Sequence, residues 1–256
     1  MLRPRIIPCL LVQDGGLVKT VNFGKPKYVG DPINAVRIFN EKEVDELIVV
    51  DIDATAHGRE PDYTMIANLA AECRMPLCYG GGVTRPDQIE RIVSLGVEKV
   101  AVSAAAVADP QLIAKASAQV GSQSVVVVLD VKKTRRGYEV HTHNGQKATG
   151  RLVTDLAREA EALGAGEIVI NSIDQDGVMK GYDLALARAV REVITRPMTV
   201  LGGAGSLDDV AALVREFDIV GAAAGSLFVF KGVYRAVLIN YPNRATKDEL
   251  VAKARA

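Results

Sequence analysis

Short apolar runs alternate along the whole chain with longer segments that mix apolar and polar residues. The first run, residues 5–12, starts at a cation and leads into a loop with two glycines, which is typical of a strand buried on both faces. Similar runs follow at 47–53, 76–82, 99–103, 125–131, 167–172, 198–202 and 219–223. The pattern therefore predicts eight buried strands.

The segments between these runs carry helix signals. Asp31-Pro32 supplies an N-cap followed by proline at the first helical position, and Asp109-Pro110 repeats this pair. Helices are expected after these pairs, at 61–74, 86–95, 152–163, 183–194 and 207–217, and finally from near Gly232, with a hairpin over 135–149. Because strands alternate with helices and no Pro/Gly/Ser-rich linker intervenes, the sequence predicts an α/β fold, a single (β/α)8 TIM barrel domain spanning 1–256.

The two halves of the chain resemble each other at one fixed offset of 121 residues. Residues 45–50 resemble 166–171, Gly81-Gly82-Val83 resembles Gly202-Gly203-Ala204, and 103–104 fall opposite 224–225. A duplicated half-barrel would produce this pattern, and would give a pseudo-two-fold site for a ligand with two similar ends. The alternative is chance similarity between apolar strands.

The composition of the chain argues against several classes of function. Lys+Arg and Asp+Glu both number 31, Trp is absent and aromatic residues are 5%, so nothing indicates nucleic-acid binding or attraction to anionic lipid. No apolar run reaches the roughly 18–20 residues of a membrane span, and the N-terminus lacks a signal-peptide pattern. Cys9, Cys73 and Cys78 show no metal spacing and are expected to be reduced residues of a cytoplasmic protein. His141 and His143 lack a third ligand, so we expect no metal, and no cofactor either.

Candidate chemistry gathers where the predicted strands end. Gly80-Gly81-Gly82 and Gly202-Gly203 each stand between a strand and a helix, where backbone N–H groups and the helix dipole favour anions. Two such places predict a ligand with a phosphate at each end, although tight strand-to-helix turns would require the same glycines. Asp130 ends an apolar strand, so its pKa should rise toward a range useful for acid/base catalysis unless it only caps a loop. Aspartates 51, 174 and 176 also follow strands, and some of them are expected only to organise loops.

Four charged residues stand at the opposite ends of the predicted strands. Arg5, Glu46, Lys99 and Glu167 lie at or just before the start of the first, second, fourth and sixth strands. Two cations and two anions placed there can form a ring over the lower mouth of the barrel. The alternative interpretation is that these four charges only keep that end of the barrel hydrated.

Several collinear motifs together resemble one family over nearly the whole chain. They are Arg5-Ile6-Ile7 with Cys9-Leu10, Lys19, Gly30-Asp31-Pro32, Asp45-Glu46-Leu47, Asp51-Ile52-Asp53, the two glycine clusters, Gly121 to Val127, Asp130, Gly164 to Ile168, and Ser172 to Gly177. The sequence is similar to the cyclase subunit of imidazole glycerol phosphate synthase, the HisF family, a lyase-type enzyme of histidine biosynthesis. In that family the barrel receives ammonia from a class I glutaminase (HisH-like) docked at its lower end and delivers it to a bisphosphorylated substrate at its upper end.

The resemblance implies roles residue by residue. Arg5, Glu46, Lys99 and Glu167 match the ammonia gate, and Asp130 matches one of two catalytic aspartates. The positions implied to contact substrate or phosphate are Lys19, Asp51, Gly82, Ser103, Asn171, Asp176, Gly177, Gly203, Ala224, Gly225 and Ser226. The implied ligand is a phosphorylated or nucleotide-linked small molecule.

Four positions depart from the family pattern. The first catalytic aspartate is replaced by Leu11, while Ser103, Asn171 and Leu201 replace the usual Asn, Thr and Ser. Losing one carboxylate of an acid/base pair lowers the rate of catalysis by a factor on the order of 10² to 10⁴. Residues 7–11, with 17–21 and 26–35, resemble a divergent branch of the family that serves surface-polysaccharide (O-antigen) biosynthesis, where ammonia converts an acetamido sugar to an acetamidino sugar with the help of a ligase.

Three functions stay open at this point. The chain is an ammonia-channelling synthase subunit for a sugar derivative, a genuine histidine-pathway cyclase that tolerates Leu11, or a non-catalytic partner that docks and activates a glutaminase.

Overall fold

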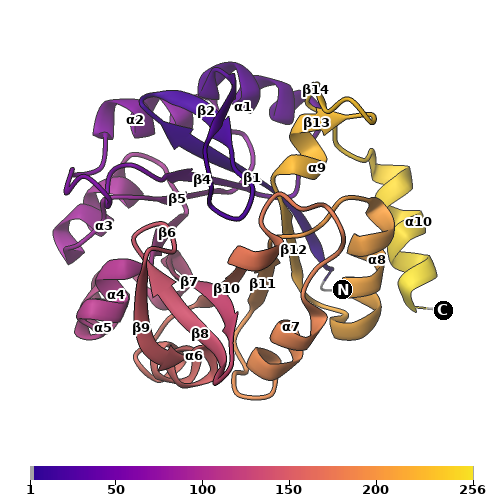
Figure 1. Cartoon of the computed structure of the whole chain (residues 1–256). Helices are drawn as coiled ribbons and strands as arrows, with labels where there is room; N and C mark the ends of the chain where they lie inside the picture. The colour runs from indigo at the N-terminus through magenta and orange to yellow at the C-terminus, as the bar shows by residue number, and fades with distance from the viewer. Residues whose placement is uncertain (1–2, 256) are drawn as a thin grey trace.

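The computed structural model describes residues 3–255, which form a closed barrel of eight parallel strands (Figure 1). The strands are β1 (Arg5–Gln13), β4 (Leu47–Asp51), β5 (Leu77–Gly80), β6 (Lys99–Val102), β7 (Val125–Thr134), β10 (Glu167–Ser172), β11 (Met198–Leu201) and β12 (Gly221–Ala224). Each pairs in parallel with the next, and the pairing of β12 with β1 closes the ring. The predicted TIM barrel is confirmed.

Helices surround the barrel, and side-chain caps begin several of them. They are α1 (Pro32–Glu41), α2 (Tyr63–Glu72), α3 (Pro86–Ser94), α4 (Ala104–Ala108), α5 (Gln111–Val120), α6 (Val153–Ala162), α7 (Leu184–Arg191), α8 (Leu207–Phe217), α9 (Ser226–Val229) and α10 (Arg244–Arg255). Asp31 accepts from the Asn34 backbone N–H at 2.8 Å and begins α1 as predicted. Ser206 and Asp209 form a capping box at α8. Each cap satisfies backbone N–H groups that have no partner within the helix.

Two apolar cores form because the strands are apolar on both faces. The larger core fills the space between the outside of the barrel and the helices. The smaller core fills the inside of the barrel and consists of Ile7, Cys9, Ile48, Cys78, Ala101, Val126, Val169 and Ala223, none more than 5% exposed. Because these side chains fill the inside of the barrel, it is a packed core rather than an open pore. Burying one such aliphatic side chain contributes about 1.5–3 kcal/mol to the stability of the fold.

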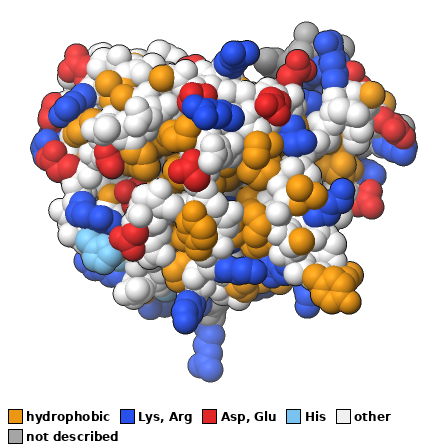
Figure 2. Space-filling model, turned by 90° about the horizontal axis from the view of Figure 1, so that it is seen from above, with side chains coloured by type: hydrophobic (Ala, Val, Ile, Leu, Met, Phe, Trp, Pro, Cys, Tyr) orange, Lys and Arg blue, Asp and Glu red, His pale blue; other side chains and the backbone are white. Residues whose placement is uncertain are grey.

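Three antiparallel hairpins extend beyond the barrel. β2 (Gly16–Lys19) and β3 (Lys27–Gly30) extend from β1, and β8 (Gly137–Thr142) and β9 (Lys147–Leu152) extend from β7, which confirms the hairpin expected over 135–149. The third consists of β13 (Phe230–Lys231) and β14 (Ala236–Val237) and lies at the outer edge of the molecule (Figure 1). The face in Figure 2 shows hydrophobic side chains interspersed with Lys and Arg near one edge.

The prediction of a final helix beginning near Gly232 is wrong. Gly232 has a φ of +72° and forms the turn of the third hairpin. The helix begins at Arg244, after Pro242, where Asn243 accepts from the Thr246 backbone N–H at 2.9 Å. A glycine with positive φ favours a turn over a helix start, whereas Asn is a strong N-cap. No helix within residues 3–255 is long and apolar enough to span a membrane.

Candidate active site

A cavity of about 270 Å³ opens where the barrel strands end. The eleven positions implied to contact substrate or phosphate line this cavity together with Leu11 and Asp130: Leu11, Lys19, Asp51, Gly82, Ser103, Asp130, Asn171, Asp176, Gly177, Gly203, Ala224, Gly225 and Ser226. Asp174, which also follows a strand, does not line it. The lining residues come from every barrel strand or from the segment that follows it. The structure therefore brings together residues that are up to about two hundred positions apart in the sequence.

Asp130 is the carboxylate of this cavity best placed for proton transfer. It lies on β7 directly opposite Asn171 of β10, whose amide nitrogen donates to Asp130 Oδ1 at 2.9 Å. Burial raises the pKa of the Asp130 carboxyl to about 6, the hydrogen bond from Asn171 opposes this rise, and the charge of Asp176 adds to it. A carboxyl with a pKa near 6 exchanges protons at neutral pH, as a general acid or base must.

Leu11 faces the same cavity from β1. Together with Val50, Val128 and Leu201 it packs on the inner core and lines the cavity. This wall holds no proton donor or acceptor. An acid/base pair would need a second group that can donate or accept a proton. At position 11 this cavity has a hydrocarbon side chain instead.

Lys19 is a buried cation beside the cavity. It is 6% exposed, and its Nζ donates to the Cys9 carbonyl oxygen at 2.6 Å. Burial lowers the pKa of the Lys19 ammonium. A Cβ at Gly225 would lie 2.4 Å from Nζ, so a larger residue there would displace the ammonium from its present position. Within residues 3–255 no carboxylate lies within ion-pair distance of Lys19, which leaves this charge available to an anionic ligand.

Two aspartates of the cavity wall organise loops. Asp51 Oδ1 accepts from the backbone N–H groups of Asp53 and Ala54 at 2.9 and 3.0 Å. Asp176 Oδ2 accepts from the Thr20 hydroxyl at 2.6 Å and from the Phe23 backbone N–H at 3.2 Å. Asp176 thus fixes the segment between β2 and β3 over the barrel mouth, as expected for some of these aspartates.

The glycines at the strand ends are required by backbone packing. Gly82 has a φ of +71°, and a Cβ there would lie 2.7 Å from the Arg59 carbonyl oxygen. Gly203 has a φ of +110°, and a Cβ there would lie 2.0 Å from the Gly181 carbonyl oxygen. Both the tight-turn interpretation and the anion-site interpretation predict these glycines. The turns also place both residues in the cavity wall, so the two interpretations are compatible here.

The opposite end of the barrel holds the predicted ring of charges. Lys99 Nζ contacts Glu46 at 2.8 Å and Glu167 at 2.9 Å, and Arg5 contacts Glu46 and, at 2.7 Å, Glu167. Burial by itself would raise the pKa of Glu167, but Arg5 and Lys99 outweigh it and hold this pKa at about 2. The Thr199 hydroxyl donates to Glu167 Oε1 at 2.5 Å and so belongs to the same network.

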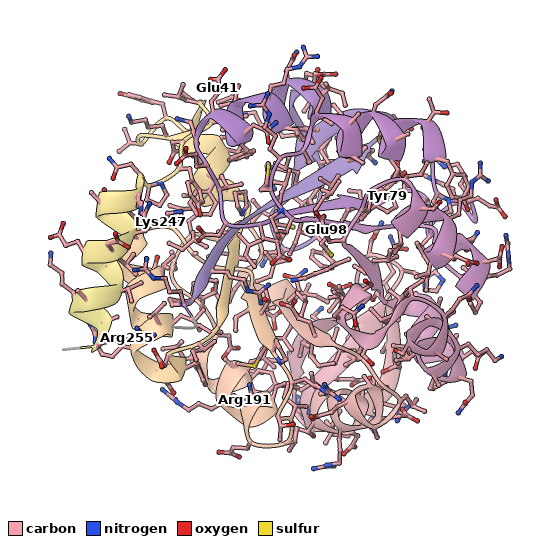
Figure 3. The ribbon with its side chains drawn as sticks, turned by 180° about the vertical axis from the view of Figure 1, so that it is seen from behind. Glu41, Tyr79, Glu98, Arg191, Lys247 and Arg255 are labelled. Atoms are coloured by element: carbon pink, nitrogen blue, oxygen red, sulfur yellow. The ribbon has the colours of Figure 1, made fainter. Side chains whose placement is uncertain are left out.

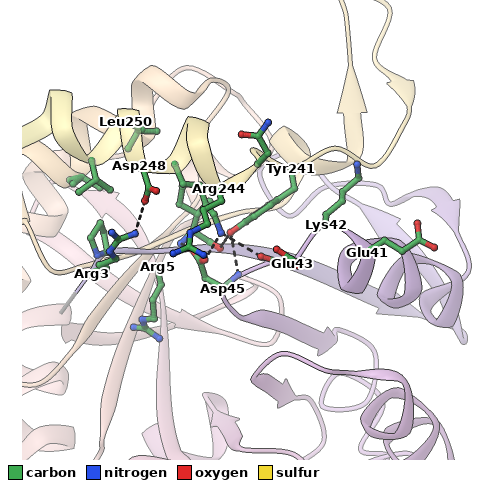
Figure 4. Close-up of a pocket in the computed structure, with 16 residues that line it drawn as sticks. Arg3, Arg5, Glu41, Lys42, Glu43, Asp45, Tyr241, Arg244, Asp248 and Leu250 are labelled. Atoms are coloured by element: carbon green, nitrogen blue, oxygen red, sulfur yellow. Dashed lines mark hydrogen bonds and ion pairs between the residues drawn. The ribbon is translucent and has the colours of Figure 1, made fainter. Parts of the chain in front are cut away.

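A groove of about 750 Å³ lies beside this ring (Figure 4). Its wall includes Arg5, the loop before β4, and α10. Lys247 of α10 pairs with Asp45 at 2.6 Å, and the Tyr241 hydroxyl donates to the Ile6 carbonyl oxygen at 2.8 Å. In the view from behind (Figure 3) Lys247 and Arg255 lie on α10, with Glu98 nearer the middle of the molecule.

Comparisons with known proteins show the family of this chain. The family described as "Histidine biosynthesis protein" matches residues 5–235. A protein from Leptospira borgpetersenii named "Putative imidazole glycerol phosphate synthase subunit HisF" is 57% identical over 252 residues, 98% of this chain and 99% of the relative. The chain belongs to the HisF family. A Pseudomonas aeruginosa relative whose name ends in hisF2 is 52% identical over 244 residues, 95% of this chain and 97% of its own length. The Hyphomonas neptunium "Imidazole glycerol phosphate synthase subunit HisF" is 43% identical over 230 residues, 90% and 91% of the two chains.

The HisF barrel of this chain also places residues in the cavity that sequence reasoning missed. The tip of the β8–β9 hairpin contributes His143, Asn144 and Gln146, and Asn144 Nδ2 donates to the Ile52 carbonyl oxygen at 3.0 Å across the barrel mouth. Polar residues at a hairpin tip were the available signal, but Ile52, which Asn144 contacts, directly follows a strand that is far away in the sequence. His57 is exposed and does not line the cavity. No cluster of metal-ligating side chains occurs within residues 3–255.

Proposed function

We propose that this chain is an ammonia-channelling synthase subunit of a glutamine-dependent amidotransferase, in a HisF branch whose substrate is not that of the histidine pathway. The observation that carries this proposal is an asymmetry between the two ends of the barrel. All four gate residues implied by the family resemblance meet in one ring, whereas position 11 at the other end is a hydrocarbon that lines the cavity.

The proposed path starts at the lower end. A class I glutaminase docks around the ring and the groove beside Arg5, with Glu98 in the docking surface. Ammonia then passes the ring and the inner core, which is lined by aliphatic residues and by Cys9 and Cys78. A neutral molecule crosses an apolar core at lower cost than an ammonium ion, because desolvating a charge is expensive. The path ends in the cavity at Asp130.

The cavity fits an anionic acceptor. Lys19 supplies a buried positive charge, the two glycine turns supply backbone N–H groups, and Asp130 supplies one proton-transfer group. The substrate class that the resemblance implies is a phosphorylated or nucleotide-linked sugar whose acetamido group becomes acetamidino. Replacing the amide oxygen by nitrogen requires that oxygen to leave, so we assign its activation to a separate ligase.

The relatives support a branch distinct from the histidine-pathway subunit. The Pseudomonas aeruginosa relative whose name ends in hisF2 is 52% identical to this chain, and a Vibrio vulnificus relative whose name ends in hisF3 is 55% identical. The Hyphomonas protein, whose name has no such number, is 43% identical. A cytoplasmic location belongs to the same proposal.

Two other functions make different predictions. A genuine cyclase subunit would rescue a histidine auxotroph, whereas we expect no rescue. The Leu11→Asp variant restores the second carboxylate, and we expect it to gain little cyclase activity because positions 103, 171 and 201 differ as well. Rescue by the wild-type chain would overturn the proposal in favour of the histidine pathway.

The gate assignment is tested with the paired glutaminase. Lys99→Ala or Glu167→Ala should lower glutamine-dependent product formation while ammonia-dependent formation changes little. Lys115→Ala, an exposed lysine on α5, is the matched control and should leave both unchanged. Equal loss with glutamine and with ammonia would contradict a gate, and absence of ammonia-dependent turnover would favour a docking partner without catalysis.

A further inference from the structure

Two long segments of this chain each combine at least three Lys or Arg residues with no acidic residue. No Asp or Glu occurs between Asp14 and Asp31, or between Asp218 and Asp248, although the chain has 31 of them. The first segment contains β2 and β3, and the second contains β12, α9 and the β13–β14 hairpin. The overall charge balance of the chain therefore hides a local separation of charge.

The structure joins parts of these two segments around one aromatic ring. Lys27 Nζ of β3 lies 5.6 Å from the centre of the Phe230 ring of β13, and the Arg235 guanidinium lies 4.8 Å from the same centre. Cations are attracted to the face of an aromatic ring. β3 and the β13–β14 hairpin are thereby held together as one surface, which also carries the exposed side chains of Lys25 and Lys231.

Large apolar side chains project from the same surface. Val233 is 90% exposed and Tyr234 is 95% exposed, at the turn of the hairpin. Tyr28 of β3, Val237 and Leu238 are also exposed. We call these five residues together with Lys25, Lys27, Lys231 and Arg235 the basic rim. Figure 2 shows hydrophobic groups among Lys and Arg near one edge of the molecule, in keeping with such a surface.

The basic rim adjoins the cavity mouth. Arg235 donates to the Gly177 carbonyl oxygen at 3.3 Å, and Gly177 lines the cavity. Ser226, at the start of the helix that precedes the hairpin, lines it as well. Whatever surface the rim contacts therefore lies next to the opening of the site.

We propose that the basic rim docks on the surface of an anionic lipid bilayer. Val233 and Tyr234 stand at the tip of a projecting hairpin, which suits insertion into a fluid interface, and the charges of the rim are all positive. Tyrosine favours the water–lipid interface, and exposed apolar residues with Lys and Arg are the two signals that peripheral binding needs. Each Lys or Arg near an anionic leaflet strengthens binding about fivefold. Binding should be reversible and sensitive to salt.

Sedimentation with lipid vesicles tests this proposal directly. The full chain should bind vesicles of phosphatidylcholine and phosphatidylglycerol at 3:1, and bind at least tenfold less to pure phosphatidylcholine or at 0.5 M NaCl. Val233→Ser with Tyr234→Ser should weaken binding at least tenfold. Lys25→Gln with Lys231→Gln should weaken it about 25-fold, from about fivefold per charge. Ile219→Ser, which changes an exposed apolar residue outside the rim, should leave it unchanged.

A fluorescent reporter separates insertion from simple charge attraction. The chain has no Trp, so Tyr234→Trp places a single indole at the hairpin tip. Its emission should shift to shorter wavelength with anionic vesicles, whereas Tyr63→Trp on α2 should show no shift. No sedimentation with anionic vesicles, equal binding to both vesicle types, or an unshifted indole would overturn the proposal. If the proposal is overturned in this way, an acidic protein surface would be the partner that the charges of the basic rim suit. None of these outcomes depends on the ammonia-channelling function.

Discussion

Replacing Asp130 with Asn should stabilise the fold at alkaline pH. The pKa of this carboxyl lies at about 6 against an ordinary value of 3.8, mainly because the surrounding protein shields it from water. At about 1.4 kcal/mol per pH unit, keeping it ionised in the folded state costs about 3 kcal/mol. Its side chain is only partly buried and faces the cavity, where water reduces this cost, so we expect D130N to gain about 1–3 kcal/mol at pH 8.

The pH dependence has a definite sign. Because the folded-state pKa is raised, the protonated carboxyl is favoured by the fold, and the penalty is present at pH values above about 6. The penalty fades as pH falls from about 6 toward 3.8 and is absent below that value. The advantage of D130N should therefore be largest at pH 8 and small at pH 4. The Asn171 amide keeps an acceptor in the variant, since the new side chain retains one oxygen.

Urea unfolding of the wild-type chain and D130N at pH 8, 6 and 4 measures this difference. Asp14→Asn is the control, because Asp14 is an exposed turn residue whose charge the fold does not bury. A difference between wild type and D130N that stays constant from pH 8 to pH 4 would refute the reasoning. So would a variant less stable than wild type at pH 8. Either result would mean that burial does not control this carboxyl.

Three further changes should alter stability, each measured by urea unfolding. Gly221→Ala should cost more than about 2 kcal/mol, because the added Cβ would lie 1.8 Å from the Thr199 hydroxyl; an effect within about 0.5 kcal/mol would contradict this. Glu167→Gln should cost about 3 kcal/mol at pH 7, because it removes a buried negative charge that compensates the half-buried cations Arg5 and Lys99, and the cost should shrink as pH falls through about 4 toward the Glu167 pKa of about 2. Tyr241→Phe should cost about 1–2 kcal/mol, because it leaves the Ile6 carbonyl oxygen without this donor; no loss would show that water replaces it.

The fold is predictable from the sequence because its signals are local. Each barrel strand is an apolar run, and caps such as Asp31 and Ser206 stand where helices begin. The error at the C-terminus has a local cause as well. The last helix is expected from the sequence to begin near Gly232, after the eighth strand. The positive φ of Gly232 suits the turn of a short hairpin instead, and the residue that caps the last helix is Asn243.

The candidate site is predictable for a different reason. Residues at the ends of parallel strands must meet at one end of a barrel, so their positions along the strands suffice to bring Asp130 and Asn171 to the same site. Residues carried by excursions follow no such rule. His143 and Asn144 reach the cavity only because the β8–β9 hairpin bends over the mouth, where Asn144 bonds to Ile52. No periodic pattern in the sequence encodes that contact.

The two ends of the barrel differ in polarity, although stability alone does not account for the difference. At the lower end, four charges share one partly or fully buried ring, and a ring of this kind is on average no more stable than well-packed apolar residues in its place. At the upper end, Leu11 shows that this barrel accepts a hydrocarbon where its family resemblance implies a carboxylate, and there it simply extends the inner core. Stability would therefore favour hydrocarbons at both ends. The ring needs a reason other than stability, and control of what enters the bore is the role that the proposed function gives it.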